Sequence, residues 1–240
     1  MATSGDTTFT LNRNEMINAS FRTIGVGVRG EALSAEEIAD GSEALNLMLK
    51  AWDAYGLPLW RRDKLSLTLV ASQSAYTIGP SGADVTAPRP LRVLEVNRKD
   101  SNNNTSPIEL LSLNEWSMLP DRVTASASAP VNAYFDPTTS SATLNIWPMP
   151  NATPAAEYTI EFWVHSPVED MDSSTDNFDC PPEWLEAIKY GLAKRLADEY
   201  SVPDQQYYRI RSMAKDSLEL AKAWDTEDTS WQFEPYEEGY

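Results

Sequence analysis

The chain has 240 residues, 42% of them apolar, which suits one or two domains with a buried core. Its 19 basic and 36 acidic residues give a net charge of −17, which argues against a nucleic-acid-binding module and against docking on an anionic membrane. A single cysteine, Cys180, excludes an intramolecular disulfide, and no apolar run reaches the roughly 20 residues of a membrane-spanning helix. The lack of a disulfide framework makes a reducing compartment the simpler expectation, and the opening residues do not show the pattern of a secretion signal.

Two helices are predicted near the N-terminus, and each begins with a capping box. Asn12 can cap the first helix while Glu15 reaches back to it, and Ser34 and Glu37 repeat this spacing at the second. Gly41 falls on the apolar face of the second helix, where it permits close contact with a neighbouring helix. That face comprises Ile38, Leu45, Met48, Leu49, Trp52 and Tyr55.

From about residue 61 the hydrophobic period changes from that of a helix to the two-residue alternation of strands. Alternation is clearest over Leu65–Leu69 and Tyr158–Val164, and the turn-rich segment Asp136–Ser141 separates the two strands of a hairpin. Polar segments such as 101–106 are typical of loops. We therefore predict an antiparallel β domain over residues 61–170.

The helical period returns after Pro181 and Pro182, which stand where the first turn of a helix tolerates proline. The connection at 200–204 is short, so the last helix should turn back antiparallel to the one before it. Its expected buried face is Tyr207, Ile210, Ala214, Leu218, Ala221 and Trp224. Because each helix is apolar on one side only, the pairs from the two chain ends should pack together. The predicted fold class is α+β: an antiparallel helical bundle from residues 1–60 and 171–228, with the β domain inserted between its halves.

The last dozen residues, 229–240, show neither the helical nor the strand period. The chain from Asp216 onward carries eight acidic residues and one basic residue, Lys222, which fits a frayed acidic terminus. Four large aromatics within residues 229–240 favour instead an extended C-terminal arm that becomes ordered on a partner. The candidate partner-binding residues are Trp231, Phe233, Tyr236 and Tyr240.

Patterns of catalytic or metal-binding residues are not found in this sequence. Its one histidine, His165, has no Gly-x-Ser-x-Gly serine to pair with, and Cys180 lies beside two prolines. The acidic stretch 169–176 lacks the glycine and terminal glutamate of a calcium loop, and the glycines at 25–30 follow a helix rather than a strand. We therefore expect no catalytic residues, no cofactor and no metal, and hence a protein that is not an enzyme.

Motifs along nearly the whole chain, in this order and spacing, resemble the head-to-tail adaptor proteins of short-tailed bacteriophages, also called tail accessory factors or packaged-DNA stabilisation proteins. Each motif alone is mostly the apolar face of a helix or a turn sequence, so the resemblance depends on the order and spacing of all of them. They are Asn18–Val26, Glu43–Trp60, Tyr76–Gly79, Arg89–Val93, Asn132–Pro137, Leu144–Pro150, Pro182–Ala193 and Met213–Lys215.

This resemblance implies a structural protein of the virion neck, between head and tail, assembled in the host cytoplasm. It implies a homo-oligomeric ring, usually a dodecamer, that joins the portal protein to the tail nozzle or tail tube protein. Genomic DNA would pass through the lumen without specific binding, and no membrane would be involved. The acidic composition fits this expectation, because an acidic ring repels phosphates and lets DNA slide.

A second function remains open from the sequence alone. A β domain with Trp116, Trp147 and Trp163 could stack sugars, as in a carbohydrate-binding or receptor-binding module of a phage tail. Packing of these side chains in a core would explain them as well.

Overall fold

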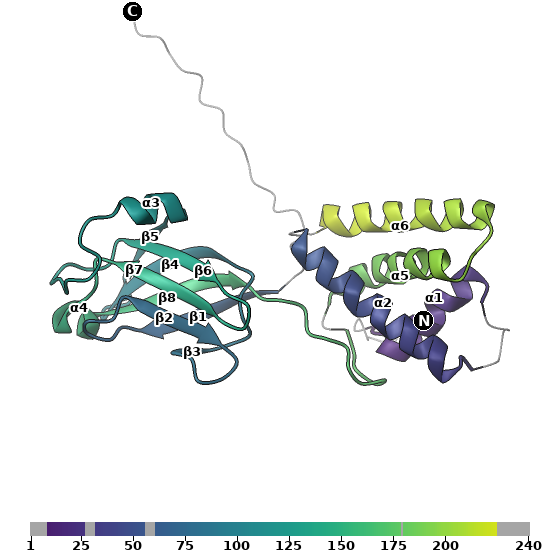
Figure 1. Ribbon diagram of the computed structural model, residues 1–240, viewed down its shortest axis with the longest axis horizontal. Coiled ribbons are helices and arrows are strands. Elements are labelled where there is room, and N and C mark those ends of the chain that lie inside the picture. The colour runs from purple at the N-terminus through teal and green to yellow at the C-terminus, as the bar shows by residue number, and fades with distance from the viewer. Residues whose placement is uncertain (1–8, 27–31, 56–60, 179, 225–240) are drawn as a thin grey trace, which may run out of the picture. The chain divides into compact units, whose positions relative to one another are not determined.

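The computed structural model describes residues 9–26, 32–55, 61–178 and 180–224. Arg61–Glu169 form one compact unit, built on a β-sheet, and the described residues on either side of it form a second, helical unit. The fold is α+β, and along the chain long helices precede and follow the segments that form the sheet (Figure 1). None of the described helices is both long and apolar enough to cross a membrane.

The helical unit contains four long helices and one short 3-10 helix. α1 (Arg13–Ile24) and α2 (Ala35–Ala54) precede the sheet; η1 (Pro182–Trp184), α5 (Leu185–Glu199) and α6 (Asp204–Trp224) follow it. Figure 1 shows α6 running back along α5, and α5 also contacts α1 and α2. α5 is therefore the centre of this unit. The largest fully buried side chains of the helical unit include Trp184, Phe21, Met16, Ile17, Leu45, Met48 and Leu49.

Both predicted capping boxes are confirmed. The Asn12 side chain accepts from the Glu15 backbone N–H at 2.9 Å, and the Glu15 carboxylate accepts from the Asn12 N–H at 3.0 Å. Ser34 and Glu37 make the same reciprocal pair at 3.2 and 2.7 Å. These bonds satisfy backbone donors that would otherwise be orphaned at the start of each helix.

Two small residues set how closely the helices of this unit approach. A Cβ added at Gly41 would lie 2.6 Å from Cγ2 of Ile17, so only glycine fits where α2 crosses α1. Ser20 is fully buried, and its Oγ lies 3.0 Å from the Met16 carbonyl oxygen and 3.1 Å from that of Lys189 on α5. The predicted role of Gly41 in close helix packing is thus confirmed.

The acidic segment after the sheet folds against the helices of this unit. Asp170 forms an ion pair with Lys50 at 2.9 Å, and the Met171 backbone N–H donates to the Asn46 side chain at 3.1 Å. Arg13 donates to the Met171 and Asp172 carbonyl oxygens at 3.1 and 2.8 Å. The segment is therefore anchored by α1 and α2 and is not a free linker.

The sheet unit has eight strands that form a nearly closed, barrel-like sheet. In spatial order the strands are β1, β8, β4, β5, β6, β7, β2 and β3. Their bounds are β1 Arg62–Thr68, β2 Ala75–Gly79, β3 Val85–Thr86, β4 Arg92–Asp100, β5 Thr105–Leu110, β6 Asn132–Pro137, β7 Ala142–Trp147 and β8 Tyr158–His165. Inward-facing side chains such as Tyr76, Ile78, Leu144, Ile160 and Phe162 fill its core and are fully buried.

The expectation of a purely antiparallel sheet is wrong, because the sheet is mixed. β5 pairs with β6 in parallel, and so does β2 with β3, while the other pairs are antiparallel. The connection between β5 and β6 contains a helix, α3 (Leu113–Met118), which was not predicted. That crossover lets consecutive strands run in the same direction, whereas a tight hairpin turn would reverse them. The predicted hairpin is confirmed as the antiparallel pair β6–β7.

Three local expectations also need correction. Tyr55 was placed on the buried face of α2 but is 85% exposed, because α2 ends at Ala54 and Tyr55 lies beyond its last turn. A short helix, α4 (Ala152–Glu157), interrupts the predicted strand region between β7 and β8. Strand β5 begins at Thr105, inside the stretch expected to be a loop. The side chain of Trp224 and all of residues 229–240 lie outside the described residues.

Candidate partner-binding groove

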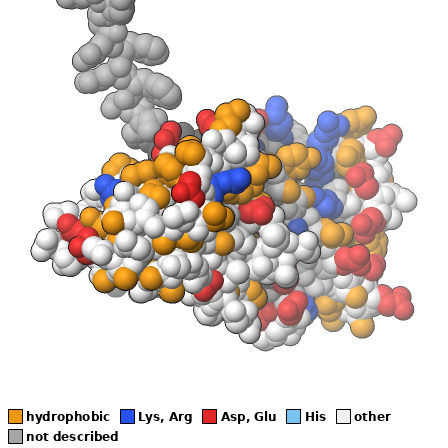
Figure 2. Space-filling model, turned by 60° about the vertical axis from the view of Figure 1, so that its left-hand side comes forward, with side chains coloured by type: hydrophobic (Ala, Val, Ile, Leu, Met, Phe, Trp, Pro, Cys, Tyr) orange, Lys and Arg blue, Asp and Glu red, His pale blue; other side chains and the backbone are white. Residues whose placement is uncertain are grey.

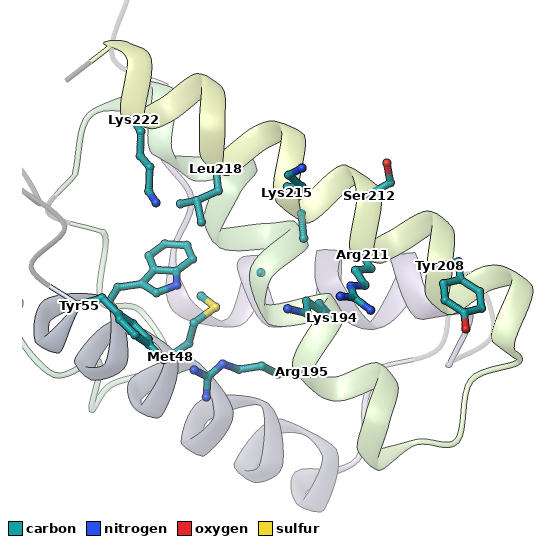
Figure 3. A pocket seen from close by; sticks show the side chains of 13 residues that line it. Met48, Tyr55, Lys194, Arg195, Tyr208, Arg211, Ser212, Lys215, Leu218 and Lys222 are labelled. Atoms are coloured by element: carbon teal, nitrogen blue, oxygen red, sulfur yellow. The ribbon is translucent and has the colours of Figure 1, made fainter. Parts of the chain in front are cut away.

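A groove of about 900 Å³ lies in the helical unit between α2, α5 and α6 (Figure 3). We call it the basic groove. Thirteen residues line it: Met48, Trp52, Tyr55, Gly191, Lys194, Arg195, Tyr208, Arg211, Ser212, Ala214, Lys215, Leu218 and Lys222. The groove thus combines apolar, aromatic and cationic side chains from three helices, of which α2 is far in sequence from α5 and α6.

The floor of the basic groove depends on a glycine in the middle of α5. A Cβ added at Gly191 would lie 2.9 Å from Sδ of Met48 and 3.0 Å from Cζ2 of Trp52. The missing side chain therefore lets these two α2 residues lie against α5. Trp52 in turn packs on Trp184, with ring centroids 6.2 Å apart and the rings tilted. The apolar floor is held in place by packing below it.

Five cations from α5 and α6 surround this floor: Lys194, Arg195, Arg211, Lys215 and Lys222. The helical unit together with the chain ends holds 11 of the 19 basic residues, so nearly half of its positive charge gathers here. The lining residues, all of them described, include no Asp or Glu. Figure 2 shows several Lys and Arg side chains gathered toward the upper right of the view, while others and the carboxylates are spread more widely. In a strongly acidic chain, this is a local reversal of charge.

Aromatic side chains stand at the edges of the basic groove. Tyr55 is 85% exposed and Tyr208 is 65% exposed, unlike the tyrosines that fill the cores. In Figure 3, Lys222 and Arg211 point from α6 toward α5 and α2, and Arg195 points from α5 toward α2. Exposed aromatics beside Arg are typical of surfaces that bind another protein.

The basic groove was not among the sites predicted from the sequence. On α6, Tyr208, Arg211, Lys215 and Lys222 recur at intervals of three, four and seven residues, which places them on one face of a helix. That spacing could have predicted a cationic face on α6. The sequence could not predict that Lys194 and Arg195 join this face, since that depends on how α5 packs against α6.

The two candidate chemical residues belong to different units. His165 is buried at the end of β8 in the sheet unit, whereas Cys180 precedes η1 in the helical unit. Among the described residues there is no group of three or more His, Cys, Asp or Glu side chains that could hold a metal ion. The basic groove itself offers cations and rings, which suit binding and provide no nucleophile paired with a base.

The three tryptophans proposed as a sugar platform do not share a surface. Trp116 is buried and stacks on Tyr134, with ring centroids 5.9 Å apart. The Trp147 indole donates to the Pro120 carbonyl oxygen at 3.0 Å. Trp163, which is 39% exposed, stands on β8, separated from β6 and β7 by β4 and β5. Packing explains the position of Trp116, and its hydrogen bond explains that of Trp147.

The four predicted partner-binding residues, Trp231, Phe233, Tyr236 and Tyr240, lie outside the described residues. In the comparison with protein families, residues 15–233 match a family model described as SU10 adaptor protein. The match covers both the helical and the sheet unit. A search of curated proteins found no match for this chain.

Proposed function

We propose that this chain, which belongs to the SU10 adaptor protein family of phage adaptors, forms a ring in the virion neck that joins the portal to the tail. The family match over residues 15–233 carries the proposal, because it spans both units and not a single module. The family is a structural one and implies no enzymatic activity.

The proposed partners are the portal protein on one side and the tail nozzle or tail tube protein on the other. Each subunit would also contact two copies of itself, giving a closed ring that we expect to be a dodecamer. A ring of this kind needs two different complementary surfaces on each subunit.

We assign separate roles to three parts of the chain. Residues 1–60 and 171–228 would act as the bundle that builds the ring, residues 61–170 as the inserted module, and residues 229–240 as an arm that docks on a partner. The DNA would pass through the lumen without specific binding, which the net charge of −17 favours because phosphates are repelled. Assembly would take place in the host cytoplasm before the neck becomes part of the virion.

Co-sedimentation with purified portal rings tests the proposal. The full chain should pellet with the portal, and deletion of residues 229–240 should weaken this attachment while the melting temperature stays nearly unchanged. Duplex DNA at physiological salt should bind more weakly than at micromolar affinity. A chain that never associates with portals at saturating concentration contradicts the proposed function.

A further inference from the structure

Four of the five cations that line the basic groove, Lys194, Arg195, Arg211 and Lys215, have little local compensation among the described residues. Lys194, Arg195 and Arg211 make no ion pair with any acidic residue that the structure describes, and Lys215 pairs only with Glu219, in a solvent-exposed contact of 3.7 Å. Like charges brought together in this way repel one another. An anionic partner that enters the groove relieves this repulsion, so the groove is suited to an acidic ligand.

The sequence of this chain contains a segment with the complementary chemistry. Residues 225–240, which we call the C-terminal segment, carry six acidic residues and no basic ones. They also carry Trp231, Phe233, Tyr236 and Tyr240. Carboxylates match the cations, and aromatic rings can pack on the apolar floor or lie against the guanidinium groups of Arg195 and Arg211.

The length of the C-terminal segment also fits the groove. From Tyr208 to Lys222 the groove follows α6 for about 21 Å, since a helix rises about 1.5 Å per residue. An extended chain covers that distance with about seven residues, at about 3.3 Å each. The C-terminal segment has more than enough residues to fill the groove and to span a connection to it.

We propose that the basic groove binds the C-terminal segment of a neighbouring copy of this chain. The inference rests on the proposed ring, in which a groove on one subunit and a segment on the next form a head-to-tail contact that repeats until the ring closes. It goes further by naming the two surfaces that meet and the residues on each. The alternative of nucleic acid is less suited, because the apolar floor offers nothing to a phosphate backbone and the surrounding unit is acidic.

Fluorescence anisotropy of a labelled peptide with the sequence of residues 225–240, titrated with the full chain at concentrations that keep it monomeric, tests the binding. The peptide should bind saturably, and raising the salt from about 0.1 to 0.5 M should weaken binding because the contacts are largely electrostatic. Arg211→Glu should weaken binding about tenfold. The matched control is Arg209→Glu, on the same helix but outside the lining of the groove, which should leave the affinity unchanged.

Two further arms identify what the groove recognises. A peptide with its four aromatics replaced by alanine keeps its charge and should bind at least tenfold more weakly. A short DNA duplex should not displace the wild-type peptide. Absence of saturable binding, equal losses for Arg211→Glu and Arg209→Glu, equal affinity of the alanine peptide, or displacement by DNA would each overturn the proposal. Circular dichroism confirms that each variant is folded before it is compared.

Photo-crosslinking decides which copy supplies the segment. A full chain with a photoreactive phenylalanine analogue at position 236 is mixed with an isotope-labelled copy under assembly conditions. Crosslinks should reach labelled peptides from α2, α5 or α6; crosslinks confined to the same copy, or to the sheet unit, overturn the inference.

Portal attachment is measured separately. A chain that attaches to portals but does not bind the peptide refutes only the groove, and one that binds the peptide but never attaches refutes only the proposed function.

Discussion

The sheet unit is continuous in sequence, whereas the helical unit is assembled from segments at both ends of the chain. In the helical unit, Ser20 of α1 meets the Lys189 carbonyl oxygen of α5, across 169 positions of sequence. In the sheet unit, neighbouring strands such as β6 and β7 are joined by a short hairpin. The insertion thus keeps the contacts of the sheet within residues 61–169, even where distant strands such as β1 and β8 pair, while the helices before the sheet must find those that follow it.

The two units also differ in charge. Residues 61–169 hold 8 basic and 11 acidic residues, a nearly balanced set, while the remainder holds 11 basic and 25 acidic ones. In the sheet unit, charges pair across strands: Glu161 lies 2.6 Å from Lys64 and 3.1 Å from Lys99. In the helical unit, five of the cations gather in the basic groove without a carboxylate in its lining. The helical unit is therefore the part whose electrostatics favour a partner.

Truncation of a buried ring should have the largest effect and should show whether the units are independent. Phe162→Ala in the sheet core and Phe21→Ala in the helical core each remove a fully buried ring and should cost about 3–5 kcal/mol of unfolding free energy. Urea denaturation should show each variant lowering the transition of its own unit alone. Trp163→Ala, at a 39% exposed ring, is the control and should cost less. If both transitions shift together in either variant, the units are coupled and the comparison fails.

Gly41→Ala should have the next largest effect. The new methyl group would lie 2.6 Å from the buried Ile17 side chain, and this overpacking outweighs the better helix propensity of alanine. We expect a net loss of about 1–2 kcal/mol in the helical unit. Gly79→Ala in the sheet unit is the matched control: its Cβ would lie 3.4 Å from Ser141 Cβ, an ordinary contact. Equal melting temperatures for both variants would mean that close contact between α1 and α2 does not limit stability.

The capping boxes allow a smaller but closely matched comparison. Ser34→Ala removes the cap of the twenty-residue α2 and should cost about 1 kcal/mol. Ser112→Ala removes the same cap from α3, which has six residues and a largely exposed surface, and should cost about half as much. Thermal unfolding measures both. A larger loss for Ser112→Ala would indicate that α3 holds the β5–β6 crossover together.

Alkaline pH should produce the smallest effect, confined to one side chain of the helical unit. Partial burial, with a hydrogen bond to Asp40, raises the pKa of Tyr200 from 10.0 to about 12. In the unfolded chain the Tyr200 hydroxyl ionises at a lower pH than in the folded one. Its contribution to the free energy of unfolding is therefore complete below pH 10 and is lost as the pH rises toward 12. Tyr200→Phe should remove that component of the pH dependence. Tyrosinate absorbance should show one tyrosine fewer titrating near pH 12 in the variant; an unchanged titration contradicts this assignment.

Local signals in the sequence predicted most of the helices and the alternating strands. The spacings of Asn12 with Glu15 and of Ser34 with Glu37 predicted both N-terminal helix starts, since capping is decided by neighbouring residues. The same spacing at Ser112 and Glu115 marks the start of α3, but no helix was predicted there because strand-like alternation of apolar and polar residues dominates residues 61–170. The parallel pairs β5–β6 and β2–β3 could not be predicted, because strand direction depends on the path of the connection and not on alternation.

The basic groove shows a similar limit. The face of α6 that carries Arg211 and Lys215 follows from helical spacing, but the meeting of that face with Arg195 and Trp52 depends on packing between distant segments. Gly191 illustrates this, because nothing in the sequence around it indicates that the Trp52 ring packs against the position a Cβ would occupy. The C-terminal aromatics, in contrast, stood out by composition alone, because four large rings in an acidic stretch have little use in solvent.

Electron microscopy of this chain mixed with portal rings tests the central claim most directly. The account predicts a second ring of this chain, of about a dozen subunits, seated coaxially on each portal, with an open lumen wide enough for duplex DNA. Arg209→Glu should leave this ring unchanged, whereas Arg211→Glu should reduce the number of complete rings. Portals that carry no added ring at saturating concentrations of the chain would contradict the account.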